Sequence, residues 1–306
     1  MASTSNIKQQ ERNWLDLPSD VMANILNRIG MIDIFENAEK VCTAWLKICK
    51  DPAMWTVINM NDLLSSVAKQ TPTNMCRLAV NRSQGQLVDI TLAYAYNVTL
   101  LYYVAERSSQ LRRLEMVYGI FNNRSMTDAL MKFPMLEELN LYLIKISKEE
   151  IETVGCYCPM LKTFKVNEGA CSFRVRDTDE GSLISYNEIA IAVGQNLLKL
   201  KHLELIGNSM TNIGLQVILD NCHHLETLDL RQCLYIDLEG DLGKQCSKQI
   251  KDLKLPNDSL EGCPYISIDS SDEGYCDLDS MDLFKFPSDP KLFLVLEASM
   301  MAMMMS

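Results

Sequence analysis

Apolar residues recur along the middle of the chain with a fixed spacing. Seven times an apolar residue is followed three and five positions later by two more, and the starts lie 24, 25, 25, 39, 25 and 25 residues apart. The starts are Leu87, Leu111, Leu136, Leu161, Leu200, Leu225 and Ile250. We number each starting residue as place one of its unit, so the other apolar residues stand at places four and six. One such unit cannot bury its own apolar side chains, but stacked units share a continuous core.

The leucine-rich repeat has this form, with about 20–29 residues per unit and the core L-x-x-L-x-L, and each unit is one short strand plus a helical return. The return is clearest in the fifth unit, where Ile213, Val217 and Ile218 have helical spacing. We therefore predict an α/β fold with a solenoid over residues 87–256, a right-handed βα horseshoe of about seven repeats. The spacing of 39 includes 14 additional residues around 168–182, which we expect to form a surface loop, either a binding feature or an idle one.

The chain before the repeats has helical rather than strand spacing. Residues 1–12 are polar and are expected to be disordered. A helix with one apolar face is predicted from residues that recur every fourth position, Val21, Ile25 and Ile29, with Met22 and Leu26 beside them. Apolar residues over 31–49 predict one further helix or two, ended by the Asp-Pro pair at 51–52. Residues 59–86 are expected to form a connector or cap, with a short helix over 62–69.

The order of conspicuous residues over 13–58 resembles an F-box. The resemblance is carried by Leu17-Pro18, Ile25-Leu26, Ile29, Val41-Cys42, Trp45, Asp51-Pro52 and Trp55. Membership of this family implies a three-helix module whose exposed apolar residues bind the Skp-type adaptor of cullin-based SCF ubiquitin ligases. On that basis we expect adaptor contacts at Leu17, Pro18, Ile25, Leu26, Ile29, Val41, Cys42 and Trp45.

The composition of this segment supports a docking surface independently of the resemblance. It contains Trp14, Trp45 and Trp55 among many aliphatic residues, which is more apolar surface than so short a segment can bury alone. Each apolar side chain buried against a partner contributes on the order of 1.5–3 kcal/mol, so a few anchors sustain specific association. The alternative is that the residues cap the solenoid, as terminal repeats require, and we expect this of Trp55 and Ile58.

The repeats resemble the cysteine-containing subclass of leucine-rich repeats that is often joined to F-boxes, and the likeness is closest to plant proteins of this kind. The sixth unit fits best, since Cys233 stands at place nine and Cys222 lies three residues before the first leucine. Cys158 and Cys246 hold similar positions before other units, and Asn208 stands at place nine of the fifth. Irregular turns are expected where place nine departs from the pattern, at Gly119, Ile144, Gly169 and Asp258.

Charge and cysteine content exclude several classes of protein. The net charge is −11, so the basic surface that dominates nucleic-acid affinity is missing and we expect no nucleic-acid partner. The polar start has no apolar core of a secretory signal, and the most apolar run, 292–305, is shorter than the roughly 20 residues of a spanning helix. We therefore expect a cytoplasmic or nuclear protein without a membrane partner, and its 11 cysteines are expected to be reduced thiols.

The sequence contains no catalytic or metal-binding pattern. Cys156, Cys158 and the cluster Cys222-His223-His224 could supply soft ligands, but they lack the paired spacing of zinc sites and repeat register explains most of these cysteines. Neither a phosphate-cradling glycine loop nor a G-x-S-x-G elbow is present. We expect no metal, no cofactor and no enzymatic activity.

Strand alternation predicts where a partner would bind the repeats. Side chains at places four and six point inward, so those at places three, five and seven should face the concave surface, along which solenoids commonly bind. Substrate contacts are expected at Arg113, Glu115, Glu138, Asn140, Tyr142, Lys165, His202, Glu204, Asp229 and Arg231, with Tyr142 as the aromatic anchor.

The periodicity stops after Pro256. Residues 257–289 contain nine acidic residues and one basic residue, a composition typical of a solvated, disordered tail, which we expect over 257–306. Interleaved aromatic residues allow a second interpretation, docking on a basic partner.

These features together predict a substrate-recognition subunit of an SCF-type E3 ubiquitin ligase. The F-box would dock on the Skp-type adaptor, and through it on cullin, while the concave face would hold a target protein for ubiquitination and proteasomal degradation. The chain would act without catalysis, by raising the effective concentration of the target near the conjugating enzyme. The alternative is a non-degradative F-box/leucine-rich-repeat scaffold. A small ligand at the concave face is a further option that no residue set favours.

Overall fold

The computed structural model describes residues 14–61, 72–93, 98–119, 123–167 and 180–265. The chain divides into two units, 1–258 and 259–306, and the described part of the second is a series of turns over 259–265. The features expected at 1–12 and 62–69, most of the insertion, and most of the acidic tail lie outside the described residues. Within the described ranges, no helix has both the length and the apolar character needed to cross a bilayer.

The first unit begins with short helices. The three α-helices are α1 (Ser19–Leu26), α2 (Met31–Glu36) and α3 (Thr43–Cys49), and 3-10 turns are found at η1 (Trp14–Asp16), η2 (Ala38–Lys40) and η3 (Pro52–Trp55). The second predicted helical run is thus two helices, α2 and α3, separated by η2. It ends near the Asp-Pro pair, as expected, where the Asp51 carboxylate accepts a hydrogen bond from the Ala53 N–H at 2.9 Å and caps η3.

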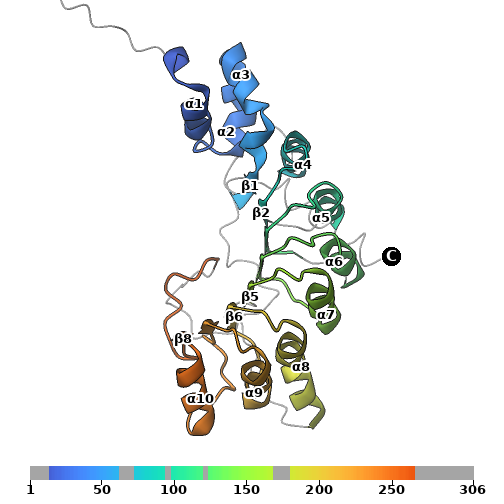
Figure 1. Ribbon diagram of the computed structural model, residues 1–306, viewed down its shortest axis with the longest axis vertical. Helices are drawn as coiled ribbons and strands as arrows, with labels where there is room; N and C mark the ends of the chain where they lie inside the picture. Colours follow the sequence, from blue (N-terminus) through green and yellow to red (C-terminus); the bar gives the residue numbers. More distant parts are fainter. Residues whose placement is uncertain (1–13, 62–71, 94–97, 120–122, 168–179, 266–306) are drawn as a thin grey trace, which may run out of the picture. The chain divides into compact units, whose positions relative to one another are not determined.

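Eight strands follow, in one parallel sheet whose order is the order of the sequence (Figure 1). They are β1 (Val57–Asn59), β2 (Asp89–Ala93), β3 (Arg113–Val117), β4 (Glu138–Tyr142), β5 (Thr163–Asn167), β6 (His202–Ile206), β7 (Thr227–Asp229) and β8 (Asp252–Lys254). The last seven coincide with the seven predicted units and each starts at place three. The predicted α/β class, with F-box helices before a leucine-rich-repeat sheet, is confirmed.

Helices connect successive strands and lie along one side of the sheet (Figure 1). They are α4 (Pro72–Arg82), α5 (Val98–Ala105), α6 (Asn123–Leu130), α7 (Lys148–Tyr157), α8 (Glu180–Asn196), α9 (Asn212–Asn221) and α10 (Asp241–Gln249). Helix α4 occupies the predicted connector and starts at a proline, which suits the first helical turn because no N–H is needed there. Helix α8 takes up residues 180–182 of the predicted insertion and, with 17 residues, is longer than the returns around it.

One hydrogen-bonding unit recurs between every pair of neighbouring strands. The carbonyl oxygen at place two of each repeat accepts N–H bonds from places two and three of the next repeat. Between β2 and β3, for example, Val88 O accepts from Arg112 N at 2.8 Å and from Arg113 N at 3.0 Å. Equal places of successive repeats are therefore aligned, as Leu114 is with Leu139.

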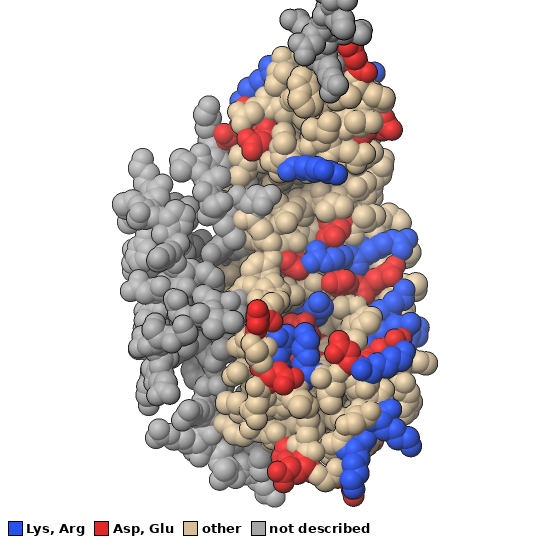
Figure 2. All heavy atoms as spheres, turned by 90° about the vertical axis from the view of Figure 1, so that its left-hand side faces the viewer, with Lys and Arg blue, Asp and Glu red and all other residues tan. Residues whose placement is uncertain are grey.

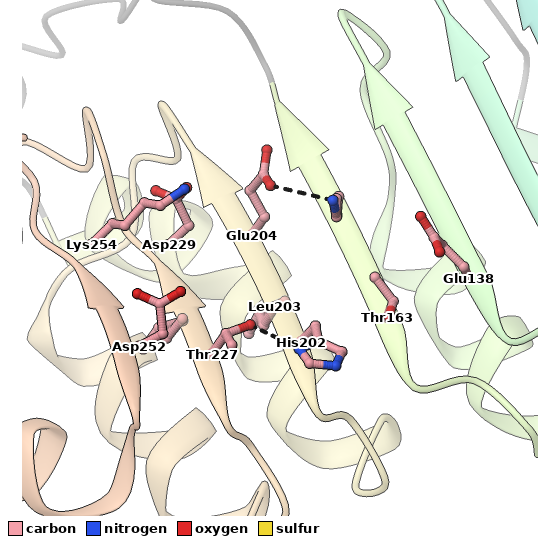
Figure 3. A pocket seen from close by; sticks show the side chains of 11 residues that line it. Glu138, Thr163, His202, Leu203, Glu204, Thr227, Asp229, Asp252 and Lys254 are labelled. Atoms are coloured by element: carbon pink, nitrogen blue, oxygen red, sulfur yellow. Dashed lines mark hydrogen bonds and ion pairs between the residues drawn. The ribbon is translucent and has the colours of Figure 1, made fainter. Parts of the chain in front are cut away.

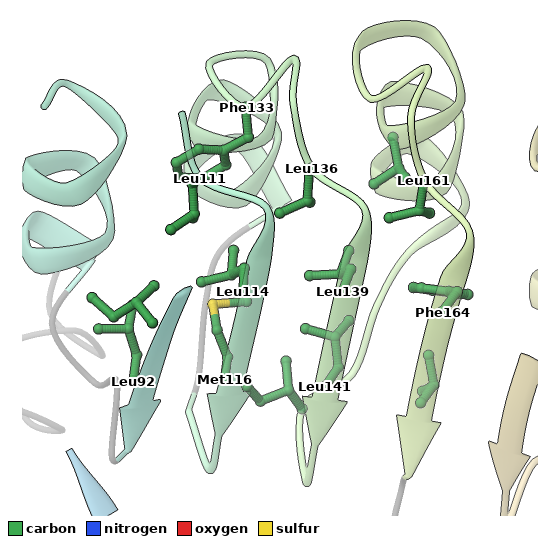
Figure 4. Close-up of a cluster of buried hydrophobic side chains, with 14 of the residues drawn as sticks. Leu92, Leu111, Leu114, Met116, Phe133, Leu136, Leu139, Leu141, Leu161 and Phe164 are labelled. Atoms are coloured by element: carbon green, nitrogen blue, oxygen red, sulfur yellow. The ribbon is translucent and has the colours of Figure 1, made fainter. Parts of the chain in front are cut away.

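The apolar residues of places one, four and six fill the space between the sheet and the helices (Figure 4). Leu111, Leu114, Leu136, Leu139 and Phe164 are fully buried. The last repeat differs, because Leu253 is half-buried and Leu255 is 43% exposed. In the part of the chain that the structure describes, β8 is the end of the sheet and has no further strand to cover these side chains.

The first strand was absent from the prediction, so the sheet has eight repeats rather than seven. Trp55, Ile58 and Met60 stand at places one, four and six of the additional unit and are 2–3% exposed. Ile58 is aligned with Ile90, and Thr56 O accepts N–H bonds from the next repeat, just as Val88 O does. The spacing W-x-x-I-x-M is that of the other units, but the unit lies 32 residues before Leu87 and overlaps the F-box motif. The closing tryptophan of the F-box is also the first core residue of the solenoid.

A cationic side chain joins the F-box to the first helical return. The Arg82 guanidinium, on α4, forms a bidentate ion pair with Glu39 of η2. The same group lies over the rings of Phe35 and Trp55, at 4.5 and 5.4 Å from their centroids, a distance at which cation–π attraction is significant. The ring of Phe35 in turn stacks on that of Trp55 at 4.9 Å.

The repeat cysteines are structural. The thiols of Cys158, Cys222 and Cys233 each donate to a carbonyl oxygen of the preceding repeat, at 3.7, 3.7 and 2.9 Å. Burial raises the pKa of Cys158 to about 12 and that of Cys222 to about 11, so both thiols stay protonated at neutral pH. No group of three potential metal-binding side chains is found among the described residues.

The first repeat can be tested with two neighbouring residues of β1. Ile58→Ala should lower the free energy of unfolding by about 2–5 kcal/mol, because it leaves a cavity in the core. Val57→Ala should change it by less than about 0.5 kcal/mol, because Val57 is 57% exposed. Denaturant unfolding of the full chain measures both. Equal effects of the two substitutions would contradict the assignment of residues 55–60 as a repeat.

Candidate functional site

The apolar residues of α1 fall into a buried and an exposed set. Met22 and Leu26 are 2% and 1% exposed and belong to the core, whereas Val21 is 40% exposed. Residues four apart share a face of a helix, so Met22 and Leu26 form the buried stripe of α1. It lies one residue along the chain from the stripe of Val21, Ile25 and Ile29 on which the helix was predicted. The stripe left outside is equally apolar.

Most of the predicted adaptor residues lie at the surface. Leu17, Pro18, Ile29 and Val41 are exposed, with Val41 60% accessible, and Ile25, Cys42 and Trp45 are half-buried. Leu26 is the exception, and its expected place on an exposed docking face is wrong, because its side chain lies in the core that the F-box shares with the repeats.

Two exposed residues were not among the predicted contacts. Trp14 is 59% exposed, and its ring meets that of Trp45 edge to face with centroids 6.5 Å apart. The second residue is Val21, which is 40% exposed. The sequence did contain one indication of further contacts, because residues 13–58 have more apolar side chains than so short a segment can bury. Apolar side chains gathered on one small module are characteristic of a protein-interaction surface.

The sheet face is less open than strand alternation predicts. Residues at place three are half-buried from β2 to β7. At place five, Glu115, Asn140 and Asp229 are buried, whereas Lys165 and Glu204 are half-buried. The residues at place seven from β2 to β7 are at most 5% exposed, namely Ala93, Val117, Tyr142, Asn167, Ile206 and Arg231.

Tyr142 is therefore not an exposed aromatic anchor, contrary to the prediction, and Arg231 is not an exposed contact. Both stand at place seven, where the strand has ended or is ending and the side chains form a buried row. The accessible part of the face consists of place three along the sheet and of place five on β5, β6 and β8, where Lys165, Glu204 and Lys254 stand. Charged side chains of both signs gather on this face (Figure 2).

One charged network covers β2 to β4. Arg113 forms ion pairs with Asp89 at 2.9 Å, with Glu138 at 3.4 Å, and with Glu115. The amide of Asn140 donates to Glu138 at 2.7 Å and to Glu115 at 3.3 Å. Four of the predicted contacts thus satisfy one another, which leaves few of their polar atoms to bind a partner.

A second network lies over β5 to β8. Asp229 accepts two hydrogen bonds from Arg231 Nε, at 2.9 and 3.1 Å, and pairs with Lys254 at 3.3 Å. Lys165 Nζ is 3.9 Å from Glu204 Oε2, an ion pair too long for a hydrogen bond. His202 Nδ1 lies 3.0 Å from Thr227 Oγ1.

The second network borders a hollow of about 440 Å³ (Figure 3). Its walls are the place-three and place-five side chains of β4 to β8: Glu138, Thr163, Lys165, His202, Glu204, Thr227, Asp229, Asp252 and Lys254, with Leu203 and Leu228 also contributing. Five of the ten predicted contacts meet here: Lys165, His202, Glu204 and Asp229 from neighbouring strands, and Glu138 at the far side. Asp252 and Lys254 also line the hollow but were not among the predicted contacts.

The pKa values of the two carboxylates at the centre of the hollow, Asp229 and Glu204, are shifted in opposite directions. Burial opposes ionisation of Asp229, but the hydrogen bonds and the charge of Arg231 outweigh burial and lower the pKa. At Glu204 burial dominates, with repulsion from Asp229 added, and the pKa is raised although Lys165 opposes the shift. Glu204 Oε1 is buried and has no hydrogen-bond partner within the described ranges. Asp229 is thus satisfied within the protein, whereas Glu204 is not.

The hollow is suited to non-covalent recognition. Its polar lining side chains are carboxylates, two ammonium groups, two threonine hydroxyls and the His202 ring, which is hydrogen-bonded to Thr227. Mixed charges on rigid strands provide specific polar contacts for a protein surface.

Known proteins share both parts of this architecture. A model of the F-box domain matches residues 14–57. The Arabidopsis thaliana F-box protein SKIP19 is 40% identical over 284 residues, which are 92% of this chain and 88% of that protein. F-box/LRR-repeat protein 22 of the same plant is 40% identical over 85% of this chain and 82% of its own length.

A third relative, Arabidopsis F-box/LRR-repeat protein 23, is 42% identical over 81% of this chain, but the chain spans only about half of it, 54%. The match with the other two extends over the F-box, the sheet and its helical returns together. This chain belongs to the plant F-box/leucine-rich-repeat protein family.

Proposed function

We propose that this protein is the substrate-recognition subunit of an SCF-type E3 ubiquitin ligase. Its F-box binds a Skp-type adaptor, and through it cullin, and its sheet face holds a target protein for ubiquitination and proteasomal degradation. The protein works in the cytoplasm or the nucleus. The observation that carries the proposal is the joining of an F-box with exposed apolar residues to a sheet whose accessible face is polar and hollowed.

The F-box surface supports adaptor binding by its chemistry. Leu17, Val21, Ile29 and Val41 are each at least 37% exposed, while Met22 and Leu26 supply the local core. Substituting the exposed set therefore removes a docking surface without removing the core. The contact residues are Leu17, Pro18, Ile25, Ile29, Val41, Cys42 and Trp45, to which the structure adds Trp14 and Val21.

The sheet face supports target binding by its geometry. Aligned strands hold the side chains of the hollow on a rigid frame, which limits the entropy lost when a partner binds. The chain contributes to ubiquitin transfer by positioning, because a target held near the conjugating enzyme reacts at a high effective concentration.

Adaptor binding should depend on the exposed apolar residues of the F-box. Leu17→Asp with Val41→Asp should weaken binding of a purified Skp-type adaptor about a hundredfold or more, because each side chain contributes on the order of 1.5 kcal/mol or more. Calorimetric titration of the full chain measures the affinity.

The matched control is Leu198→Asp with Ile213→Asp, which places the same charges on side chains that are 48% and 60% exposed outside the F-box. This control should bind the adaptor as the wild type does. An unchanged affinity of the Leu17 and Val41 variant, with an intact thermal transition, would contradict the assignment of the F-box surface.

Target binding should be separable from adaptor binding. Thr163→Trp fills the hollow and should abolish capture of targets from cells with a blocked proteasome, while adaptor binding stays normal. Ser185→Trp, at an exposed position of α8, is the control and should capture targets as the wild type does. Quantitative mass spectrometry identifies the proteins captured by the wild type and lost with Thr163→Trp.

Those same proteins should become more abundant when the Leu17→Asp and Val41→Asp variant replaces the wild type, because it holds targets without an adaptor. If their abundance does not change, the protein is a non-degradative scaffold and the ligase proposal fails.

A further inference from the structure

We infer that the hollow over β5 to β8 takes a basic side chain, arginine or lysine, from an extended segment of the target. The inference deepens the proposed function and rests on it, since the occupant is part of the bound target. It is argued from the balance of donors and acceptors around the hollow and from the charges that remain unpaired there.

The walls carry more negative than positive charge. Glu138, Glu204, Asp229 and Asp252 face two cations, Lys165 and Lys254. Two of the carboxylates are satisfied within the protein, because Asp229 is held by Arg231 and Lys254, and Glu138 accepts from Asn140 and Arg113. The charges left over determine what the hollow can bind.

The two remaining carboxylates are acceptors without adequate donors. Among the described residues, Glu204 Oε1 is buried with no hydrogen bond, and the ion pair between Glu204 Oε2 and Lys165 is long, at 3.9 Å. The carboxylate of Asp252, an exposed residue of β8 (Figure 3), has no protein hydrogen bond or ion pair among the described residues. Both acceptors belong to the same hollow, on β6 and β8.

A cationic donor resolves this imbalance. A buried carboxylate oxygen without a donor is costly, and a hydrogen bond from a charged donor is among the strongest that proteins form. An anionic side chain would instead meet four carboxylates against two lysines that are already paired. A neutral or apolar side chain would leave the carboxylates of Glu204 and Asp252 without a cationic donor.

The histidines provide a direct test, because His202 lines the hollow whereas His223 and His224 are exposed beyond α9. We would titrate the full chain with acetyl-Gly-Arg-Gly-amide, acetyl-Gly-Lys-Gly-amide and acetyl-Gly-Glu-Gly-amide and follow the ring protons of the three histidines by NMR. The two basic peptides should shift the His202 signals to a plateau and leave those of His223 and His224 in place. The glutamate peptide should shift none of them.

Glu204→Gln with Asp252→Asn should weaken binding of the arginine peptide about tenfold or more, because the charge of both acceptors is lost. Glu188→Gln with Asp241→Asn removes two carboxylates from exposed helix positions outside the hollow and should bind as the wild type does. The two double variants have the same net charge, so a difference in peptide affinity between them reports the loss of charge in the hollow rather than the loss of charge on the protein as a whole.

Three outcomes would overturn the inference: no shift of His202 with the basic peptides, a larger shift with the glutamate peptide, or equal weakening in the two double variants. Adaptor titration of the same proteins separates this inference from the proposed function. A wild type that binds the arginine peptide at the hollow but no adaptor would refute the ligase proposal alone. Normal adaptor binding without His202 shifts would refute only the basic-side-chain inference.

Discussion

The carbonyl oxygen at place two is the interaction on which the rest of the structure depends. By accepting two N–H bonds from the next repeat, it holds each strand at one register against its neighbour. A slip of one residue would turn the buried side chains of places four and six toward the outer face, so register and core burial require each other. The alignment of His202 with Thr227, and of Glu204 with Asp229, follows from the same bonds. The recognition face is therefore a product of the backbone ladder.

The spacing of apolar residues was sufficient to predict seven strands, because places one, four and six report burial directly. It did not reveal the first repeat, in which Trp55 and Met60 replace leucine and the F-box motif occupies the same residues. On α1 the spacing offered two apolar stripes, and only packing decides that Leu26 is buried while Val21 is not. Strand alternation predicted which side chains leave the core. It could not predict that Tyr142 and Arg231 are buried, because that depends on how the chain continues after each strand.

The two functional surfaces differ in their physical character. The F-box surface is apolar and suited to association through burial, whereas the sheet face is polar and suited to discrimination through charge placement. Over β2 to β4 one arginine, Arg113, links three carboxylates, whereas over β5 to β8 the buried Glu204 Oε1 has no hydrogen bond among the described residues. The two parts of the face thus differ in how their carboxylates are paired, although their strands look alike.

The double role of Trp55 bears on how the protein can be divided. The F-box match ends at residue 57, within β1, so a fragment cut there begins with part of its first strand missing. Such a fragment would lack Trp55 and Thr56, and Arg82 would lose its contacts with Phe35 and Glu39. With β1 incomplete, β2 would become the edge of the sheet. Unpaired edge strands invite pairing with other chains. A deletion intended to separate the proposed adaptor and target surfaces would therefore also alter the sheet, and point substitutions on the two surfaces avoid this confusion.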